Sequence, residues 1–175
     1  FHAFETFNLP FTQQRWTPME FNEGASMAME MLVMPYLTKE QGGFYSEKDA
    51  ARANISHLEE NLRFWPYMAI VDAFQHWAYE NPEGGMDPRA CDARWAELEK
   101  RFRPHLDWSG FEDVMMTGWH RKHHIHQAPF YYIEYGLAQL GAGQVWLNAL
   151  VDQKEAVKKY HHALQLGGTV HPPQR

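Results

Sequence analysis

The chain has 175 residues, enough for one domain with a sizeable core, and its 45% hydrophobic and 22% charged residues are ordinary for a globular protein. A formal net charge of -6 makes a nucleic-acid-binding surface unfavourable, and a single cysteine excludes an internal disulfide framework and fits a reducing compartment, here the cytoplasm. Strand patterns are nearly absent, so we predict an all-α helical array that forms one unit over residues 1–175.

The first predicted helix begins at Thr17 and runs to about Tyr36. Threonine suits the N-cap, Pro18 suits the first helical position, and Glu20 can reach back to the cap amide.

Two acidic residues of this helix share its expected apolar stripe. Glu23 heads the stripe and Glu30 lies on it two turns later. A buried carboxylate needs a cation or several donors, whereas a carboxylate at the edge of a cleft can simply stabilise the helix N-terminus, and spacing alone leaves both readings open. The stripe continues at +4, +8 and +11 from Glu23 with Met27, Met31 and Met34.

A second helix is expected to start at Ser46 and to stop near Asn81, with Pro66 kinking or splitting it. Asp72 and His76 are four residues apart on its second half and can pair on one face. Such a pair serves either structure or a site.

Residues 82–86 are predicted to be a linker turn, and Asp87 is predicted to start a third helix that ends at Pro104. Its expected buried stripe consists of Cys91, Trp95, Leu98 and Phe102.

Residues 105–128 are the least regular part and the richest in histidine. His120 and His124, four apart, could bind one zinc ion if they lay on a helix, but the sequence favours a loop from about Lys122. The other histidines of this segment are His105, His123 and His126.

A tyrosine-rich run follows, with Pro129 in the first turn of a helix that we expect to span 130–151. On that helix Tyr131, Tyr132 and Tyr135 share one side and Gln139 lies one turn further. A row of hydroxyls on an apolar helix faces either a polar cavity or a satisfied core.

This run is also the one candidate for a membrane span, but its polar side chains argue for burial within protein. They are Glu134, Gln139, Gln144 and Asn148. A last amphipathic helix is expected between Asp152 as its cap and Gly167.

Three blocks of the sequence, in order, resemble one family. The pattern His-x4-Pro-Phe-Tyr-Tyr-Ile-Glu-Tyr-Gly-x-Ala-Gln-Leu-Gly-Ala over 124–142 resembles the C-terminal signature of the oligoendopeptidase F branch of the thimet-oligopeptidase-like zinc peptidases. Residues 23–30, with the pattern Glu-x-x-Ser-x3-Glu, resemble the family segment that supplies the third zinc ligand. Residues 65–77 show a weaker likeness.

The resemblance implies a zinc metalloendopeptidase that hydrolyses short peptides by attack of a zinc-bound water, with residues 1–175 as the C-terminal part of a larger zincin-type, mostly helical catalytic domain. It implies Glu23 as a Zn2+ ligand, and we infer Glu30 as a carboxylate that holds a ligand histidine. It also implies a catalytic set that donates hydrogen bonds to the oxyanion, and a set that binds the substrate. The catalytic set consists of His124, Tyr132 and Tyr135. The substrate-binding set consists of His124, Tyr131 and Tyr132.

The His-Glu-x-x-His motif, which carries two zinc ligands and the general base, does not occur in the chain. The resemblance places it upstream of Phe1, with His2 matching a histidine just past the second ligand, and we expect the 175 residues alone to be inactive. Two alternatives remain: a helical binding or scaffold module without catalysis, and a small metal-binding protein that uses the 120–126 histidines with Glu23 or Glu30.

Overall fold

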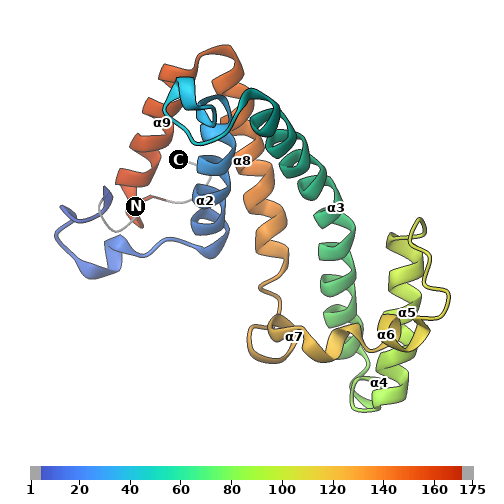
Figure 1. Cartoon of the computed structure of the whole chain (residues 1–175). Coiled ribbons are helices and arrows are strands. Elements are labelled where there is room, and N and C mark those ends of the chain that lie inside the picture. The colour runs from blue at the N-terminus through green and yellow to red at the C-terminus, as the bar shows by residue number, and fades with distance from the viewer. Residues whose placement is uncertain (1–4, 171–175) are drawn as a thin grey trace. The chain divides into compact units, whose positions relative to one another are not determined.

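The structure is a computed structural model that describes residues 5–170, apart from the side chain of Glu20, and its regular structure is helical. Within this range no strand forms and one isolated bridge joins Thr38 to Tyr45, which confirms the all-α prediction. The α-helices, labelled in Figure 1, are α2 (Met19–Val33), α3 (Glu47–Glu80), α4 (Pro82–Gly85), α5 (Pro88–Phe102), α6 (Glu112–Met116), α7 (His123–Gln127), α8 (Ile133–Val151) and α9 (Gln153–Leu166). Short 3-10 helices are η1 (Thr12–Arg15), η2 (Met34–Tyr36), η3 (Lys39–Gln41) and η4 (Gly118–Arg121).

The chain divides into two compact units by its internal contacts. The terminal unit comprises Phe1–His57 and Leu137–Arg175, and the central unit comprises Leu58–Gly136. The prediction of one helical unit within a larger catalytic domain stays a prediction.

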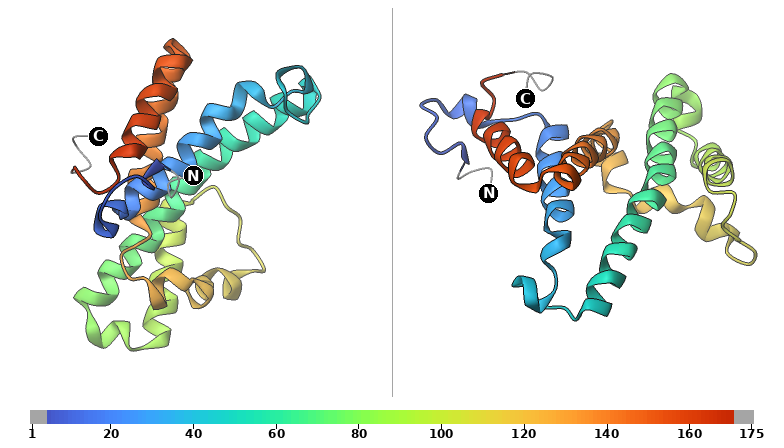
Figure 2. Two further views of the ribbon diagram at one scale, coloured as in Figure 1. Left: turned by 90° about the vertical axis from the view of Figure 1, so that its left-hand side faces the viewer. Right: turned by 90° about the horizontal axis from the view of Figure 1, so that it is seen from above.

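In the terminal unit, α9 is tied to α2 by two hydrogen bonds from side chains to the backbone. Gln153 Nε2 donates to the Leu32 carbonyl at 3.1 Å, and the Tyr160 hydroxyl donates to the Ala25 carbonyl at 2.8 Å. Both views in Figure 2 show α9, in red, next to the end of α8, in orange, and the hydrophobic cluster that joins them to α2 contains Leu32, Ala149 and Ala156.

The buried face of α2 differs from the predicted methionine stripe. Its most buried residues include Ala25 and Ala28, at 4% and 1% exposure, while the side chain of Glu30 is 60% exposed. Small residues prevail because α8 comes close: a methyl group added at Gly24 would lie 3.4 Å from the Ala138 carbonyl oxygen. The stripe was wrong for Glu30, but its methionines are covered: Met31 is buried, and Met27 and Met34 are half-buried.

Two predicted helix starts, at Ser46 and Asp87, and the predicted cap at Asp152 are confirmed. Ser46 Oγ accepts from the Asp49 amide at 3.2 Å at the start of α3. Asp87 and Asp152 likewise accept from the Arg89 and Glu155 amides at 3.0 Å, before α5 and α9. Each side-chain oxygen satisfies an amide that has no partner within its own helix.

The start of α2 was predicted one residue too early. The helix begins at Met19 with Pro18 as its N-cap, and that cap makes no side-chain hydrogen bond. Thr17 instead pairs with Asn22: its hydroxyl donates to Asn22 Oδ1, and its carbonyl accepts from Asn22 Nδ2 at 3.1 Å.

Pro66 does not split α3, a helix of 34 residues that runs through this position without a break. Proline leaves the carbonyl four residues earlier without its helical donor. That residue is Leu62, which is 74% exposed, so water can reach this part of the helix surface. Residues 82–85, expected in a linker turn, form the one-turn helix α4.

The core of the central unit is built around Trp95, which is 1% exposed. Its ring meets the ring of Phe74 nearly at right angles, with centroids 5.3 Å apart, and Gly118 packs so closely that an added Cβ would lie 2.7 Å from Trp95 Nε1. The stripe predicted on α5 is confirmed for Cys91, Trp95 and Leu98, and Phe102 packs at its edge.

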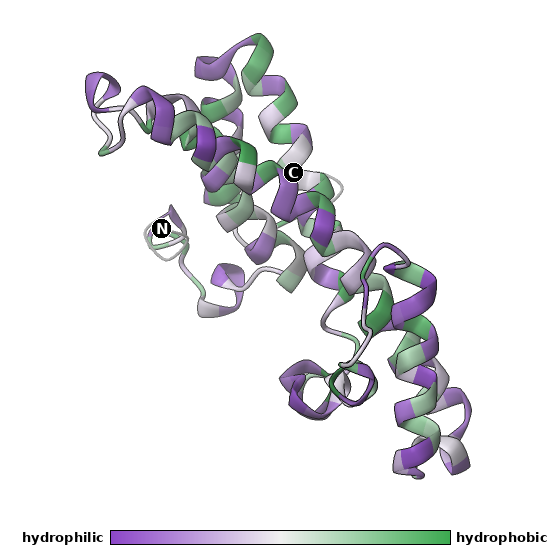
Figure 3. Ribbon diagram, turned by 45° about the vertical axis from the view of Figure 1, so that its right-hand side comes forward, coloured by the Kyte–Doolittle hydropathy of each residue, from purple (hydrophilic) through white to green (hydrophobic). Residues whose placement is uncertain are grey.

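Helix α8 is buried along one side only. Ala138, Ala142 and Ala149 are buried, but four leucines of the same helix are more than half exposed: Leu137, Leu140, Leu147 and Leu150. Figure 3 shows polar and apolar residues mixed along every long helix. None of the helices in residues 5–170 is long and apolar enough to cross a bilayer.

Tyr160 gives the terminal unit a predicted pH dependence. Burial and the Glu5 carboxylate raise its pKa from 10.0 to about 12. The folded form therefore keeps a proton that the unfolded form loses, so the stabilisation is complete below pH 10 and disappears as pH rises towards 12. We expect Tyr160→Phe to lower the free energy of unfolding by about 1 kcal/mol at pH 7 and to flatten its fall above pH 10. Urea titrations at several pH values test this. If the free energy of unfolding fell equally steeply with pH above pH 10 in both proteins, the prediction would be contradicted.

Candidate functional site

The turn before α8 positions the predicted site residues of the central unit. Phe130 has a left-handed backbone with φ of 60°, an arrangement that is uncommon for a residue with a side chain. Its amide donates to Gln75 Oε1 at 3.3 Å, and its ring lies 5.0 Å from the ring of Tyr79. The helix therefore begins at Ile133, and the prediction that it includes 130–132 was wrong.

This turn brings together the four predicted residues of the C-terminal block. His124 Nε2 and the Tyr135 hydroxyl are hydrogen-bonded at 3.2 Å. The ring of Tyr132 lies 4.9 Å from that of His124 and 5.2 Å from that of Tyr135, and Tyr131 lies 5.4 Å from Tyr135, all measured between centroids. We call His124, Tyr131, Tyr132 and Tyr135 the tyrosine–histidine cluster.

The members of the cluster differ in burial. Tyr132 is 5% exposed and belongs to the hydrophobic core, whereas His124, Tyr131 and Tyr135 are half-buried. Burial, and then the neighbouring Tyr67 and Tyr135 hydroxyls, raise the pKa of Tyr132 well above its usual value. Its hydroxyl, protonated at physiological pH like that of any tyrosine, therefore keeps its proton in more alkaline solution as well.

Three further residues surround the cluster and were not predicted as part of it. Phe64 and Tyr67 place their rings 5.7 and 5.9 Å from that of Tyr132, and Lys122 Nζ lies 3.4 Å from the Tyr132 hydroxyl. For the two aromatic residues the sequence did offer a signal, the third block of the resemblance at 65–77. Phe64 immediately precedes that block, and Tyr67 lies within it. No pattern in the sequence pointed to Lys122.

The predicted acidic residues lie in the terminal unit, on α2. Glu23 is half-buried, and its carbonyl, rather than its carboxylate, accepts the Ser26 hydroxyl at 2.9 Å. Glu30 Oε2 lies 3.8 Å from His57 Nε2. A histidine partner is compatible with the role inferred for Glu30, but His57 was not among the predicted residues.

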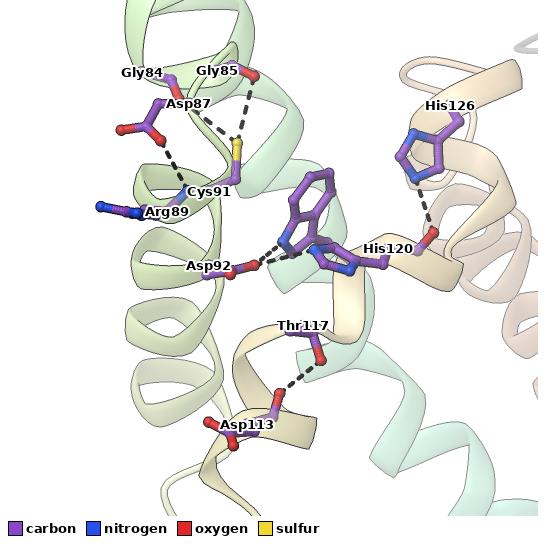
Figure 4. A network of polar contacts seen from close by, with 11 residues as sticks. Gly84, Gly85, Asp87, Arg89, Cys91, Asp92, Asp113, Thr117, His120 and His126 are labelled. Atoms are coloured by element: carbon purple, nitrogen blue, oxygen red, sulfur yellow. Dashed lines mark hydrogen bonds and ion pairs between the residues drawn. The ribbon is translucent and has the colours of Figure 1, made fainter.

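His120, His124 and His126 each contact a different group. His120 Nε2 lies 3.2 Å from Asp92 Oδ1, and the same oxygen accepts from Trp119 Nε1 at 2.8 Å. His126 Nε2 is 3.2 Å from the backbone carbonyl of His120, as Figure 4 shows, and His124 pairs with Tyr135. Asp72 and His76 form the expected pair at 3.6 Å.

Over residues 5–170 no group of three or more His, Cys, Asp or Glu side chains is arranged to hold a metal ion. The carboxylate of Glu23 is a suitable zinc donor but is one ligand where three protein ligands are needed. His2 lies outside the described residues. The geometry therefore does not favour a metal site formed by the 120–126 histidines.

Comparison with known proteins identifies the family and the fold of the chain. The model of peptidase family M3 matches residues 2–174, whereas a search of curated proteins found no significant match. Among solved structures, PZ peptidase A with an inhibitor is 31% identical with a TM-score of 0.89, and a protein assigned as an oligoendopeptidase F is 32% identical with a TM-score of 0.87. A further assigned oligoendopeptidase F, from Bacillus anthracis, is 31% identical with a TM-score of 0.77.

Each comparison covers 99% of this chain, but the chain spans only 30% of the first two structures and 26% of the third. The family match extends over nearly the whole sequence, and the matched structures share its helical fold. The chain therefore belongs to peptidase family M3 and is an oligoendopeptidase F-like member of it.

Proposed function

We propose that this chain is the C-terminal part of the catalytic region of a zinc metalloendopeptidase that hydrolyses short peptides. The observation that carries the proposal is the match to peptidase family M3 along residues 2–174. The His124–Tyr135 hydrogen bond supports it, because it joins two predicted site residues that lie eleven positions apart.

The tyrosine–histidine cluster provides the donors that peptide hydrolysis requires. As a peptide carbonyl becomes tetrahedral, its oxygen gains negative charge, and pre-oriented hydrogen-bond donors stabilise that charge. An imidazole and a hydroxyl 3.2 Å apart orient one another, and Tyr131 next to Tyr135 adds a second half-buried phenol. We assign His124, Tyr132 and Tyr135 to the oxyanion, with His124, Tyr131 and Tyr132 contributing to binding of the substrate.

Glu23 is proposed as one of three protein ligands of the zinc ion. When bound, zinc supplies Lewis-acid chemistry to such an enzyme. The other two ligands and the general base belong to a His-Glu-x-x-His motif that the 175 residues do not contain, so they would come from polypeptide outside this sequence.

The test uses the intact protein, meaning the polypeptide as its native source produces it. We expect one zinc per molecule, loss of peptide cleavage on chelation, and zinc affinity lowered more than about tenfold by Glu23→Gln, since disturbing even the partner of a ligand costs that much. Glu40→Gln, an exposed glutamate of the terminal unit, is the control and should change neither property. The isolated 175 residues are expected to cleave nothing.

Two results would reject the proposal. An intact protein that binds no zinc and cleaves no oligopeptide would favour the helical scaffold reading. Stoichiometric metal that survives Glu23→Gln but is lost on His124→Ala would favour a histidine metal site instead.

A further inference from the structure

Lys122 directs its ammonium group into the aromatic core of the central unit. Its Nζ lies 4.6 Å from the centroid of the Tyr67 ring and 4.9 Å from that of the Tyr132 ring. The same nitrogen is 3.4 Å from the Tyr132 hydroxyl. Within residues 5–170 it forms no ion pair with an Asp or Glu carboxylate. The contacts that hold this half-buried cation are therefore two tyrosine rings and one phenol.

Tyr132 connects Lys122 to the proposed site. Its buried ring stands edge-on to His124 at 4.9 Å and to Tyr135 at 5.2 Å, so it touches both partners of the His124–Tyr135 hydrogen bond. Close-packed rings transmit a displacement because no space is left to absorb it. A change in the position of Tyr132 must therefore change the geometry of that bond.

The far end of this chain of contacts is held firmly. Arg103 Cζ lies 5.1 Å from the Tyr67 ring, and its guanidinium donates to both oxygens of Glu99, a carboxylate that is 3% exposed. A buried, bidentate ion pair has little freedom to move. Tyr67 is thus a fixed support against which Lys122 can hold Tyr132.

We propose that Lys122 is a positioning residue for the tyrosine–histidine cluster: by holding Tyr132 against Tyr67, it sets the geometry of the His124–Tyr135 hydrogen bond. The catalytic consequence rests on the proposed peptidase function, but the positioning does not. Lys122 contacts the cluster through Tyr132 and acts on the His124–Tyr135 pair through that residue.

The informative variant is Lys122→Met, which keeps an unbranched apolar side chain and removes the charge, with Lys122→Gln as a second variant should the first fold poorly. The matched control is Arg101→Met. It also deletes a cation above an aromatic ring, since Arg101 Cζ lies 5.1 Å from the Phe102 ring, but outside the cluster. Lys122→Arg keeps a cation at this position and should behave much like the wild-type protein.

Two measurements on the intact protein separate the claims. In fluorine NMR with fluorotyrosine, the Tyr135 resonance, identified by its loss in Tyr135→Phe, should shift in Lys122→Met and stay in place in Arg101→Met. In peptide cleavage, Lys122→Met should lower kcat about tenfold with little change in KM, the result of misplaced rather than missing donors.

A Tyr135 resonance that stays in place in both Lys122→Met and Lys122→Gln would overturn the proposal. So would a loss of kcat in Lys122→Met that is no larger than the loss in Arg101→Met. A wild-type protein that cleaves no peptide would reject the proposed function instead, and the NMR comparison would still decide whether Lys122 positions the cluster.

Discussion

Tyr135→Phe is expected to lower kcat/KM for peptide hydrolysis by the intact protein about 100-fold, because removal of one oxyanion donor typically costs about 3 kcal/mol. The substitution deletes only the hydroxyl that is bonded to His124 at 3.2 Å. The phenylalanine ring keeps the packing against Tyr131 and Tyr132, so the fold should be unaffected.

Steady-state kinetics and thermal unfolding of the same preparations check this expectation. Tyr45→Phe is the matched control, since Tyr45 lies in the terminal unit with 45% exposure, and it should retain wild-type kinetics. A Tyr135→Phe protein with kcat/KM within about threefold of wild type would remove Tyr135 from the oxyanion site.

Trp95→Ala is expected to lower the free energy of unfolding of the central unit by about 3–5 kcal/mol. The indole is 1% exposed, meets Phe74 edge-on, and is covered by Gly118, whose backbone lies against it. Closely packed backbone cannot move into the space that alanine would leave, so a cavity should remain. Total stabilities of proteins are about 5–15 kcal/mol, and this loss would be a large share of that.

Cys91 is a convenient probe for this measurement, because it is the one cysteine of the chain, lies in the central unit and is 2% exposed. Burial, followed by Asp92 and Asp87, raises the pKa of its thiol, so it should react with an alkylating reagent only when the unit opens. Urea titrations scored by alkylation of Cys91 should show the loss in Trp95→Ala. Phe111→Ala removes an aromatic ring that is 62% exposed and should cost no more than about 0.5 kcal/mol. Equal midpoints for the two variants would contradict the assignment of Trp95 to the core.

Local signals in the sequence predicted the parts of the fold that depend on local interactions. The helix starts at Ser46, Asp87 and Asp152 were correct because the side chain of each bonds an amide two or three residues ahead. The stripe on α5 was correct because the apolar residues of this helix leave few alternatives for a buried face. On α2, methionines and alanines both fit a helical period, and the choice between them was decided by the approach of α8, which no local pattern encodes.

The site was predicted to a similar degree. The resemblance named His124 and Tyr135, which the structure places in hydrogen-bond contact. It could not give the start of α8, because apolar residues and Pro129 fit a continuous helix, whereas the chain turns at Phe130. Lys122 escaped prediction because a lysine beside other cations and histidines reads as a solvated surface residue.

The hydrogen bond from the Phe130 amide to Gln75 has a consequence for the order in which the molecule assembles. It joins residues 55 positions apart, yet it supports a turn of only a few residues. Contacts of large sequence separation require closure of a long loop, and such closure slows folding. The geometry of the tyrosine–histidine cluster is therefore a non-local property that emerges only once α3 has docked against the chain that follows α7. A synthetic peptide of residues 120–142 carries the complete signature but lacks the side chain that holds its turn.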